Sequence, residues 1–315
     1  MSELDDRAPV LTPLQRKTLD ALKRSGDPVV FDAEFVAHIR TEMRVALDEF
    51  GARLQPGFEL FVTKHRIGSA LDCEEHHLAP DDFEWKPATA KGQVAHRAIQ
   101  LMLSWRGEPS PTDLVEEAMA RLVDEDRGIG LWMATLGPAD EADLRSMSIE
   151  RVTKFMESFP PLDRRSHPVT EAAAQWPLEG PILLRARVDL MIGRPLGDES
   201  RKVIIDLKTG RPNPKHRQDL GFYALLETLA RGVPPRKLAT FYLDASEAHV
   251  EDVSERLLNT AVRRTLDGIN AMVELEAEGR APIRRPGTSC RWCPLADDCP
   301  DGRARLAADS ADLDT

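Results

Sequence analysis

The stretch VIIDLKTGR, residues 203–211, contains the strand around which the fold is predicted. It opens with three β-branched residues, which are typical of a buried strand, and a Thr-Gly pair ends it. Side chains alternate along a strand, so Asp206 and Lys208 emerge on one face and Leu207 on the other. A carboxylate and an ammonium group therefore stand side by side at the end of a core strand.

The overall composition is that of a globular protein. The chain has 315 residues, of which 42% are hydrophobic and 30% charged, and its formal net charge is −11. The acidic N-terminus shows no secretory signal, and no apolar run approaches the roughly 18 residues of a membrane helix. We therefore expect a cytoplasmic protein that binds no membrane. The net charge argues against indiscriminate binding of polyanions, although six basic residues and one acid occupy positions 201–217.

The periodicity of apolar residues predicts a helical first half and a strand-rich second half. Helices are expected near residues 12–26, 33–50, 90–104, 111–126 and 139–159. Strands are expected in VTEAAAQW, PILLRARVDLMIG, RKVIIDLKTG and LATFYLD, with helices over 215–231 and 252–278. Such a mixture indicates a central sheet flanked by helices.

A second acid lies in the strand before Asp206. Asp189 follows an apolar run in ILLRARVDLMI, and the two strands are expected to be neighbours. Two carboxylates that converge repel each other unless a divalent cation lies between them, and hard oxygen ligands suit Mg²⁺ or Mn²⁺. Lys208 would stabilise charge beside them. His96, on a helix with an apolar side, would offer an imidazole nitrogen.

Each of these residues also has a simpler interpretation. Asp206 and Lys208 would be a solvated pair at a strand end, and Asp189 would pair with Arg185 or Arg187. His96 would be an ordinary core or surface histidine. The combination of all of them is much less expected by chance than any one member.

Four segments resemble, in order and spacing, the motifs of RecB-like nucleases of the PD-(D/E)XK superfamily. They are GQVAHRAI, RARVDLMIG, VIIDLKTG and DLGFYALL. The resemblance implies a restriction-endonuclease-like α/β fold and hydrolysis of DNA phosphodiester bonds with Mg²⁺ or Mn²⁺. It also implies roles for single residues: His96, Asp189, Asp206 and the carbonyl of Leu207 as metal ligands, Lys208 as the catalytic lysine, and Tyr223 at the substrate site. The chain departs from the family at Asp219, where the family has Gln.

The four cysteines, Cys73, Cys290, Cys293 and Cys299, give a second signal. In a reducing compartment disulfides are not expected, so this spacing favours a tetrahedral zinc site or an iron–sulfur cluster. The pattern resembles the iron–sulfur branch of the same nucleases, the AddB-type helicase–nucleases and the CRISPR-associated RecB-like exonucleases. The resemblance implies a 4Fe–4S cluster, to which we assign the role of a structural staple. Zinc or unligated thiols are the alternative.

The sequence thus predicts a metal-dependent DNA nuclease, with exonuclease action expected and endonuclease action left open. The alternatives are a catalytically decayed DNA-binding or scaffold protein and a metal-bearing protein with no nucleic-acid role. No helicase P-loop is present, so a helicase, CRISPR or repair protein would be a separate partner. The expected domains are a helical N-terminal extension (1–60), the nuclease domain with its cluster (61–302) and a disordered acidic tail (303–315).

Overall fold

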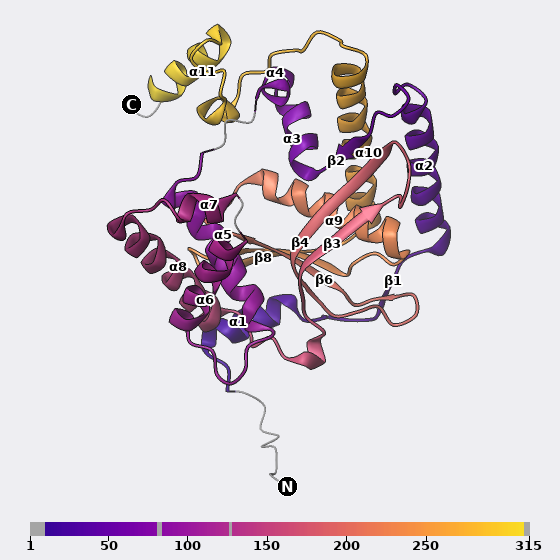
Figure 1. Cartoon of the computed structure of the whole chain (residues 1–315). Coiled ribbons are helices and arrows are strands. Elements are labelled where there is room, and N and C mark those ends of the chain that lie inside the picture. The colour runs from indigo at the N-terminus through magenta and orange to yellow at the C-terminus, as the bar shows by residue number, and fades with distance from the viewer. Residues whose placement is uncertain (1–9, 81–83, 126–127, 312–315) are drawn as a thin grey trace.

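A mixed sheet forms the centre of the computed structural model, which describes residues 10–80, 84–125 and 128–311 (Figure 1). Within these ranges six strands pair in the order β2-β4-β6-β7-β8, with β3 also paired to β4. The strands are β2 (Leu60–Val62), β3 (Val169–Trp176), β4 (Ile182–Ile192), β6 (Val203–Lys208), β7 (Lys237–Tyr242) and β8 (Glu247–Asp252). A separate ribbon pairs β1 (Val29–Val30) with β5 (Glu199–Ser200). The predicted α/β class with a central mixed sheet is confirmed.

The long strand β4 organises the sheet, because two strands share one of its edges. Leu184 pairs with both β2 and β3, and Leu190 pairs with both β3 and β6. Strand β3 must therefore run along one edge of β4, while β2 and β6 occupy opposite ends of the other edge. Since β2 is parallel to β4 and β6 is antiparallel to it, β2 and β6 run toward each other. Their C-terminal ends meet beside the middle of β4.

A helical crossover connects β6 to its parallel neighbour β7. Helix α9 (Pro214–Arg231) begins after Asn213, whose side chain accepts a hydrogen bond from the Lys215 amide, and ends at Gly232 with φ of 77°. A helix between parallel strands is the ordinary way to join them. This connection places α9 against the sheet next to the end of β6.

Helices cover both faces of the sheet, and the sheet separates the core into two clusters. One face carries α2 (Ala33–Gly51), α3 (Lys64–Asp72), α9 and α10 (Glu255–Met272), and the other carries α5 (Pro87–Met102), α6 (Pro111–Asp124) and α8 (Pro138–Ser158). In β6 the alternation is as predicted: Ile204 packs in the first cluster, whereas Ile205 and Leu207 pack in the second. Figure 1 shows these layers above and below the strands.

The remaining helices are short or peripheral. They are α1 (Pro13–Leu22), α4 (Glu74–Leu78), α7 (Ile129–Met133) and α11 (Pro300–Ala311), the 3-10 helices Arg164–Ser166 and Thr288–Trp292, and the π-helix Val273–Ala277. The sequence predicts a disordered tail from residue 303, whereas residues 303–311 form most of α11. Residues 312–315 lie outside the described ranges. In the predicted N-terminal extension, α2 packs on the same core as α9 and α10.

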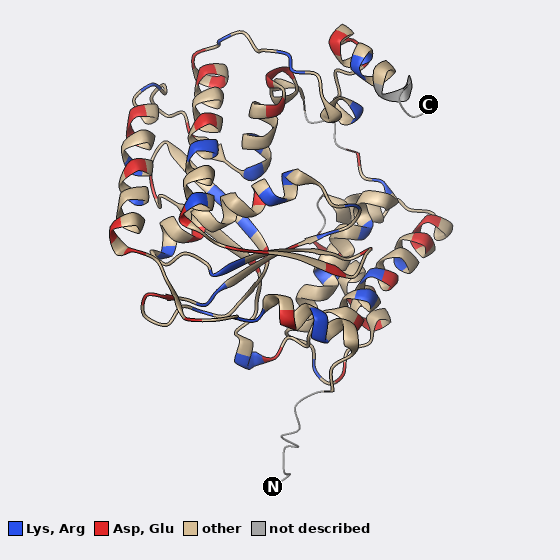
Figure 2. Ribbon diagram, turned by 180° about the vertical axis from the view of Figure 1, so that it is seen from behind, with Lys and Arg blue, Asp and Glu red and all other residues tan. Residues whose placement is uncertain are grey.

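None of the helices within the described ranges combines the length and the apolarity that crossing a bilayer requires. Acidic and basic residues are interspersed along the helices seen from behind (Figure 2).

Candidate functional site

Strand β6 separates from the edge of β4 after a short ladder, and the gap between the two strands, beside Asp189 and Leu207, is named the fork. The ladder between the two strands ends at the pair Leu190 and Ile205. One step further, the Leu207 amide donates instead to Asp189 Oδ2 at 2.7 Å. In an extended strand the N–H and C=O of one residue face the same partner, so the Leu207 carbonyl also faces the fork. The structure thus brings together Asp189 and the Leu207 backbone, as the sequence predicts.

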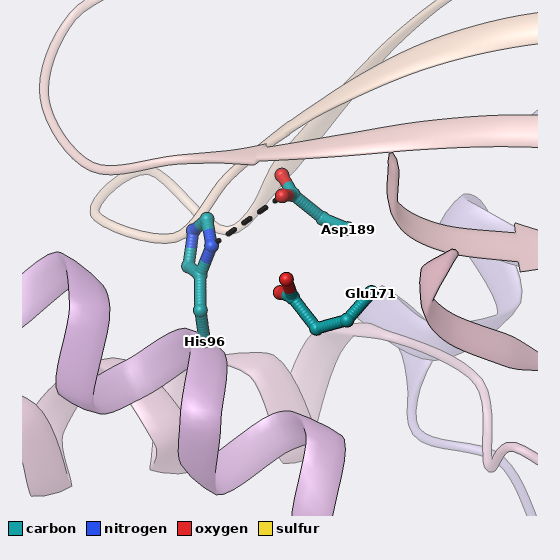
Figure 3. Close-up of side chains that lie close together, drawn as sticks. All are labelled: His96, Glu171 and Asp189. Atoms are coloured by element: carbon teal, nitrogen blue, oxygen red, sulfur yellow. Dashed lines mark ion pairs between the residues drawn. The ribbon is translucent and has the colours of Figure 1, made fainter. Parts of the chain in front are cut away.

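His96 reaches this fork from α5 on the second face of the sheet. Its Nδ1 atom lies 3.6 Å from Asp189 Oδ1, and its side chain is half-buried. The neighbouring residues Ala95 and Ile99 are fully buried and hold the helix against the core. The imidazole therefore faces inward, toward the acid with which the motif pairs it (Figure 3).

Glu171 completes a group that sequence reasoning missed. One ligand atom each of His96, Glu171 and Asp189 lies within 4.8 Å of the other two, and the three side chains point toward one another in Figure 3. On either side of Glu171 the ladder between β3 and β4 is regular, and its register places Glu171 opposite Asp189. Acids opposite each other on neighbouring strands are the signal that could have identified it. Its backbone is unusual, with φ of 51°.

Its partly buried position makes Glu171 hard to ionise. Burial and the nearby Asp189 carboxylate raise the pKa of Glu171 above its ordinary value. Two carboxylates and one imidazole in a partly buried site would be stabilised by a cation.

Asp206 is fully buried and holds two lysines instead of joining that group. Its Oδ2 atom lies 2.6 Å from Lys208 Nζ, and its Oδ1 atom accepts a hydrogen bond from Lys64 Nζ at 3.2 Å. Burial opposes ionisation, but the charges of Lys208 and Lys64 outweigh it, and the pKa of Asp206 falls below its ordinary value. Within the described ranges, the group of ligand atoms inside 4.8 Å contains His96, Glu171 and Asp189 but not Asp206.

The predicted site residues therefore form two adjacent sets that meet at one peptide. His96 and Asp189 lie at the fork with the Leu207 backbone, while Asp206 and Lys208 lie toward α9. The two sets are separate because the Asp206 side chain lies on the face of the sheet that carries Ile204, whereas the Leu207 amide points in the plane of the sheet toward Asp189 on β4. Tyr223 lies on the Asp206 side.

Tyr223 is buried on α9, and its ring centroid lies 4.7 Å from Lys64 Nζ. Burial is the main reason that the pKa of Tyr223 is raised. Asp219, one turn earlier, lies 3.4 Å from the same ammonium group through Oδ2. Lys64 is thus a second residue of this centre that the motifs do not include.

A separate corner gathers the four cysteines. Cys73, between α3 and α4, lines one cavity of about 250 Å³ with Cys290, Cys293 and Cys299. Burial, followed by the three other thiols, raises the pKa of Cys293. In the part of the chain that the structure describes, no three cysteine sulfurs lie within 4.8 Å of one another.

The buried Glu74 ties this corner to the body of the protein. Its Oε2 atom lies 2.9 Å from Arg280 Nη1 and accepts the Ile283 amide at 2.8 Å, and Oε1 lies 3.2 Å from Arg285 Nη2. The adjacent Glu75 pairs with Arg284. These ion pairs hold the cysteine-bearing loop against α4 and neutralise much of its positive charge.

Comparison with known proteins gives one family. A model described as the PD-(D/E)XK nuclease superfamily matches residues 64–300. No curated protein matches the chain. The chain is similar to the crystal structure of SSO0001, with a TM-score of 0.30 and 19% identity, over 66% of this chain and 94% of that one. It is also similar to a presumed exonuclease from Eubacterium rectale, with a TM-score of 0.31 and 11% identity, over 70% and 92%.

Proposed function

The chain belongs to the PD-(D/E)XK nuclease superfamily, and from this premise we propose that it is a metal-dependent deoxyribonuclease that acts as an exonuclease. The observation that carries the proposal is the position of Asp189. Its carboxylate lies beside His96 and is bound by the strand end that carries Asp206 and Lys208. In this proposal the metal ligands and the catalytic cation lie side by side, an arrangement that suits metal-assisted hydrolysis of a phosphodiester.

The donor atoms at the fork fit a divalent cation. Asp189, Glu171 and the Leu207 carbonyl offer hard oxygen, and His96 offers nitrogen. This set suits Mg²⁺ or Mn²⁺, with Asp206 adjacent as a further carboxylate. The pKa of Glu171 is raised, as is expected for an acid that is partly buried beside a second carboxylate with no cation between them.

The residues of the chain then have distinct roles. When bound, Mg²⁺ or Mn²⁺ supplies Lewis-acid stabilisation of phosphate charge and an activated water. Asp206 holds the Lys208 ammonium at the strand end, where it can face a phosphate and stabilise the charge that develops during attack. Lys208 is partly exposed, so substrate can reach it. Tyr223 is buried and faces Lys64, the other lysine beside Asp206.

A cleavage assay tests the proposal on end-labelled single- and double-stranded DNA with Mg²⁺ or Mn²⁺. We expect cleavage by the wild type, and rates lower by about 10²–10³-fold in Asp206→Ala and Lys208→Ala, because each loses transition-state stabilisation. Lys17→Ala, which removes an exposed lysine paired with Glu247, is the matched control. Activity in both site variants would overturn the assignment.

Two further readouts separate the alternatives. A covalently closed circle should resist the enzyme if it is an exonuclease. Binding of DNA without any cleavage by the wild type would instead favour a decayed DNA-binding protein. A helicase, CRISPR or repair partner and a cytoplasmic location stay predictions.

We also propose that the four cysteines hold a 4Fe–4S cluster as a structural staple. What supports the proposal is the position of the thiols, because Cys73 lies beside the three cysteines of the 290–299 loop although it is far from them in the sequence. The cavity that they line, of about 250 Å³, has room for an inorganic core.

Spectroscopy and metal analysis separate the cluster from a zinc site. Protein purified without oxygen should show a broad brown absorbance band and about four irons per chain. The band should disappear in Cys290→Ser. Stoichiometric zinc with no visible band would contradict the cluster.

A further inference from the structure

Lys64 is placed where helix propensity does not explain it. Strand β2 ends at Val62, Thr63 caps α3 by accepting the Arg66 amide, and Lys64 is the first helical residue. The positive end of the helix dipole disfavours a cation at this position. A different interaction must therefore account for the lysine.

The surroundings of its side chain supply that interaction. Lys64 Nζ lies 3.2 Å from Asp206 Oδ1 and 3.4 Å from Asp219 Oδ2, and its side chain is 13% exposed. It also faces the ring of Tyr223. Burial alone would lower the pKa of Lys64, but the charge of Asp206 and the other neighbours outweigh it and raise the pKa. The group is held charged, from β6 on one side and α9 on the other.

The charges do not balance around Asp206 alone. One carboxylate neutralises one ammonium, and Lys208 already occupies Oδ2. Asp206 alone therefore does not neutralise Lys64, and Asp219 is the second acid beside its ammonium group. Asp219 occupies the position at which the nuclease motifs have Gln. The pair of Asp219 and Lys64 therefore distinguishes this centre from the pattern of those motifs.

We propose that Lys64 is a second phosphate-binding cation of the hydrolytic centre and that Asp219 is its positioning residue. The inference rests on the proposed nuclease function and names how that site holds the DNA backbone. Lys64 begins α3 just after β2, and β2 approaches the end of β6 along the edge of β4. Lys64 and Lys208 therefore flank Asp206 from a helix and a strand. Lys64 also lines a small cavity of about 10 Å³ with Gln218 and Arg264.

DNA binding without metal tests the contact directly. We compare Lys64→Gln, which can still donate a hydrogen bond to Asp206, with Lys17→Gln, which makes the same charge change on α1. Figure 1 places α1 at the opposite end of the molecule from α3. The readout is the anisotropy of a labelled oligonucleotide in EDTA over a series of salt concentrations.

The expected result is a change in salt dependence. If Lys64→Gln loses one phosphate contact, the slope of the logarithm of the DNA association constant against the logarithm of the salt concentration should become smaller in magnitude by about 0.7–0.9. The slope should not change in Lys17→Gln. If Lys64 only neutralised Asp206, the variant would melt at a lower temperature with an unchanged slope. That outcome would overturn the proposal.

Single-turnover cleavage tests the role of Asp219. We expect Lys64→Gln to slow cleavage about 10²-fold and Asp219→Asn about tenfold. Because Asp219 acts through Lys64, the double variant should be no slower than Lys64→Gln. Additive effects would overturn the role of Asp219. Should Lys64→Gln fail to fold, Lys64→Arg with near wild-type slope and rate would support the proposal, and a wild-type rate in Asp219→Asn would contradict it.

The two proposals fail in different ways. A wild type that cuts no DNA would overturn the nuclease function, while the binding slope in EDTA would still decide whether Lys64 contacts phosphate. An active wild type with unchanged slope and rate in Lys64→Gln would overturn the present inference alone.

Discussion

Glu171 carries backbone strain at the point where the chemistry is expected. Its φ of 51° lies in the left-handed region, which costs a residue other than glycine on the order of 1–3 kcal/mol. The pairs on either side of it keep the register of β3 on β4, so the distortion is confined to one residue. Strain of this kind persists where the surroundings fix it, and here it accompanies an acid directed at His96 and Asp189.

The first residue-scale prediction concerns Glu171→Gln. Burial and Asp189 raise the pKa of Glu171, so folding favours the protonated form. The stabilisation is present at low pH and is lost as the pH rises through the folded-state value. At neutral pH the metal-free Gln variant should therefore unfold at a higher temperature than the wild type.

The same substitution should weaken metal binding. We expect about 10–100-fold lower affinity for Mn²⁺, measured by titration with electron paramagnetic resonance, and less thermal stabilisation by Mn²⁺. Glu247→Gln on β8 is the control, because that side chain is half-exposed and pairs with Lys17. A destabilised variant with unchanged Mn²⁺ affinity would show that Glu171 has only a structural role.

At the scale of elements, local patterns predict the strands but not all of their partners. Alternation in VIIDLKTG places Asp206 and Leu207 on different faces, and the structure agrees. The three-residue strand β2 is too short to show a period, and its place on the edge of β4 depends on contacts more than a hundred residues apart. The contact of Lys64 with Asp206 therefore could not be predicted from the motifs.

The candidate site shows the same limit. His96 and Asp189 follow from motif spacing, and the structure brings them within 3.6 Å. Glu171 was missed because an acid in an alanine-rich strand is expected to face solvent. Its position opposite Asp189 depends on the register of β3 on β4, which the sequence does not give. Sequence alone could not predict that Asp206 would pair with two lysines, because one of them, Lys64, comes from the start of α3, far away in the chain.

For the whole molecule, the C-terminal part lies apart from the sheet. Figure 1 shows α11 and the loop before it at one end, next to α4 and away from the sheet. The buried Glu74 binds Arg280, Arg285 and the Ile283 amide, and so holds this loop to the body. Segments at the periphery open locally at lower free energy than a core.

The last prediction is that Glu74 controls this opening. Burial opposes its ionisation, but Arg280 and the other donors outweigh burial and lower the pKa of Glu74. The stabilisation is therefore present at neutral pH and is lost as the pH falls through the folded-state value, below the ordinary 4.5. Glu74→Gln should remove this stabilisation at every pH.

Hydrogen exchange measures the opening. The Gln variant loses charged hydrogen bonds worth about 1.5–3 kcal/mol, so amide exchange in residues 283–299, normalised to the intrinsic rate, should become about 10–100-fold faster. Strands β4 and β6 should stay protected. Glu75→Gln, the same change at a more exposed pair, should have little effect. Equal effects of the two variants, or exchange that spreads into the sheet, would show that the cysteine corner is not held as a separate unit by Glu74.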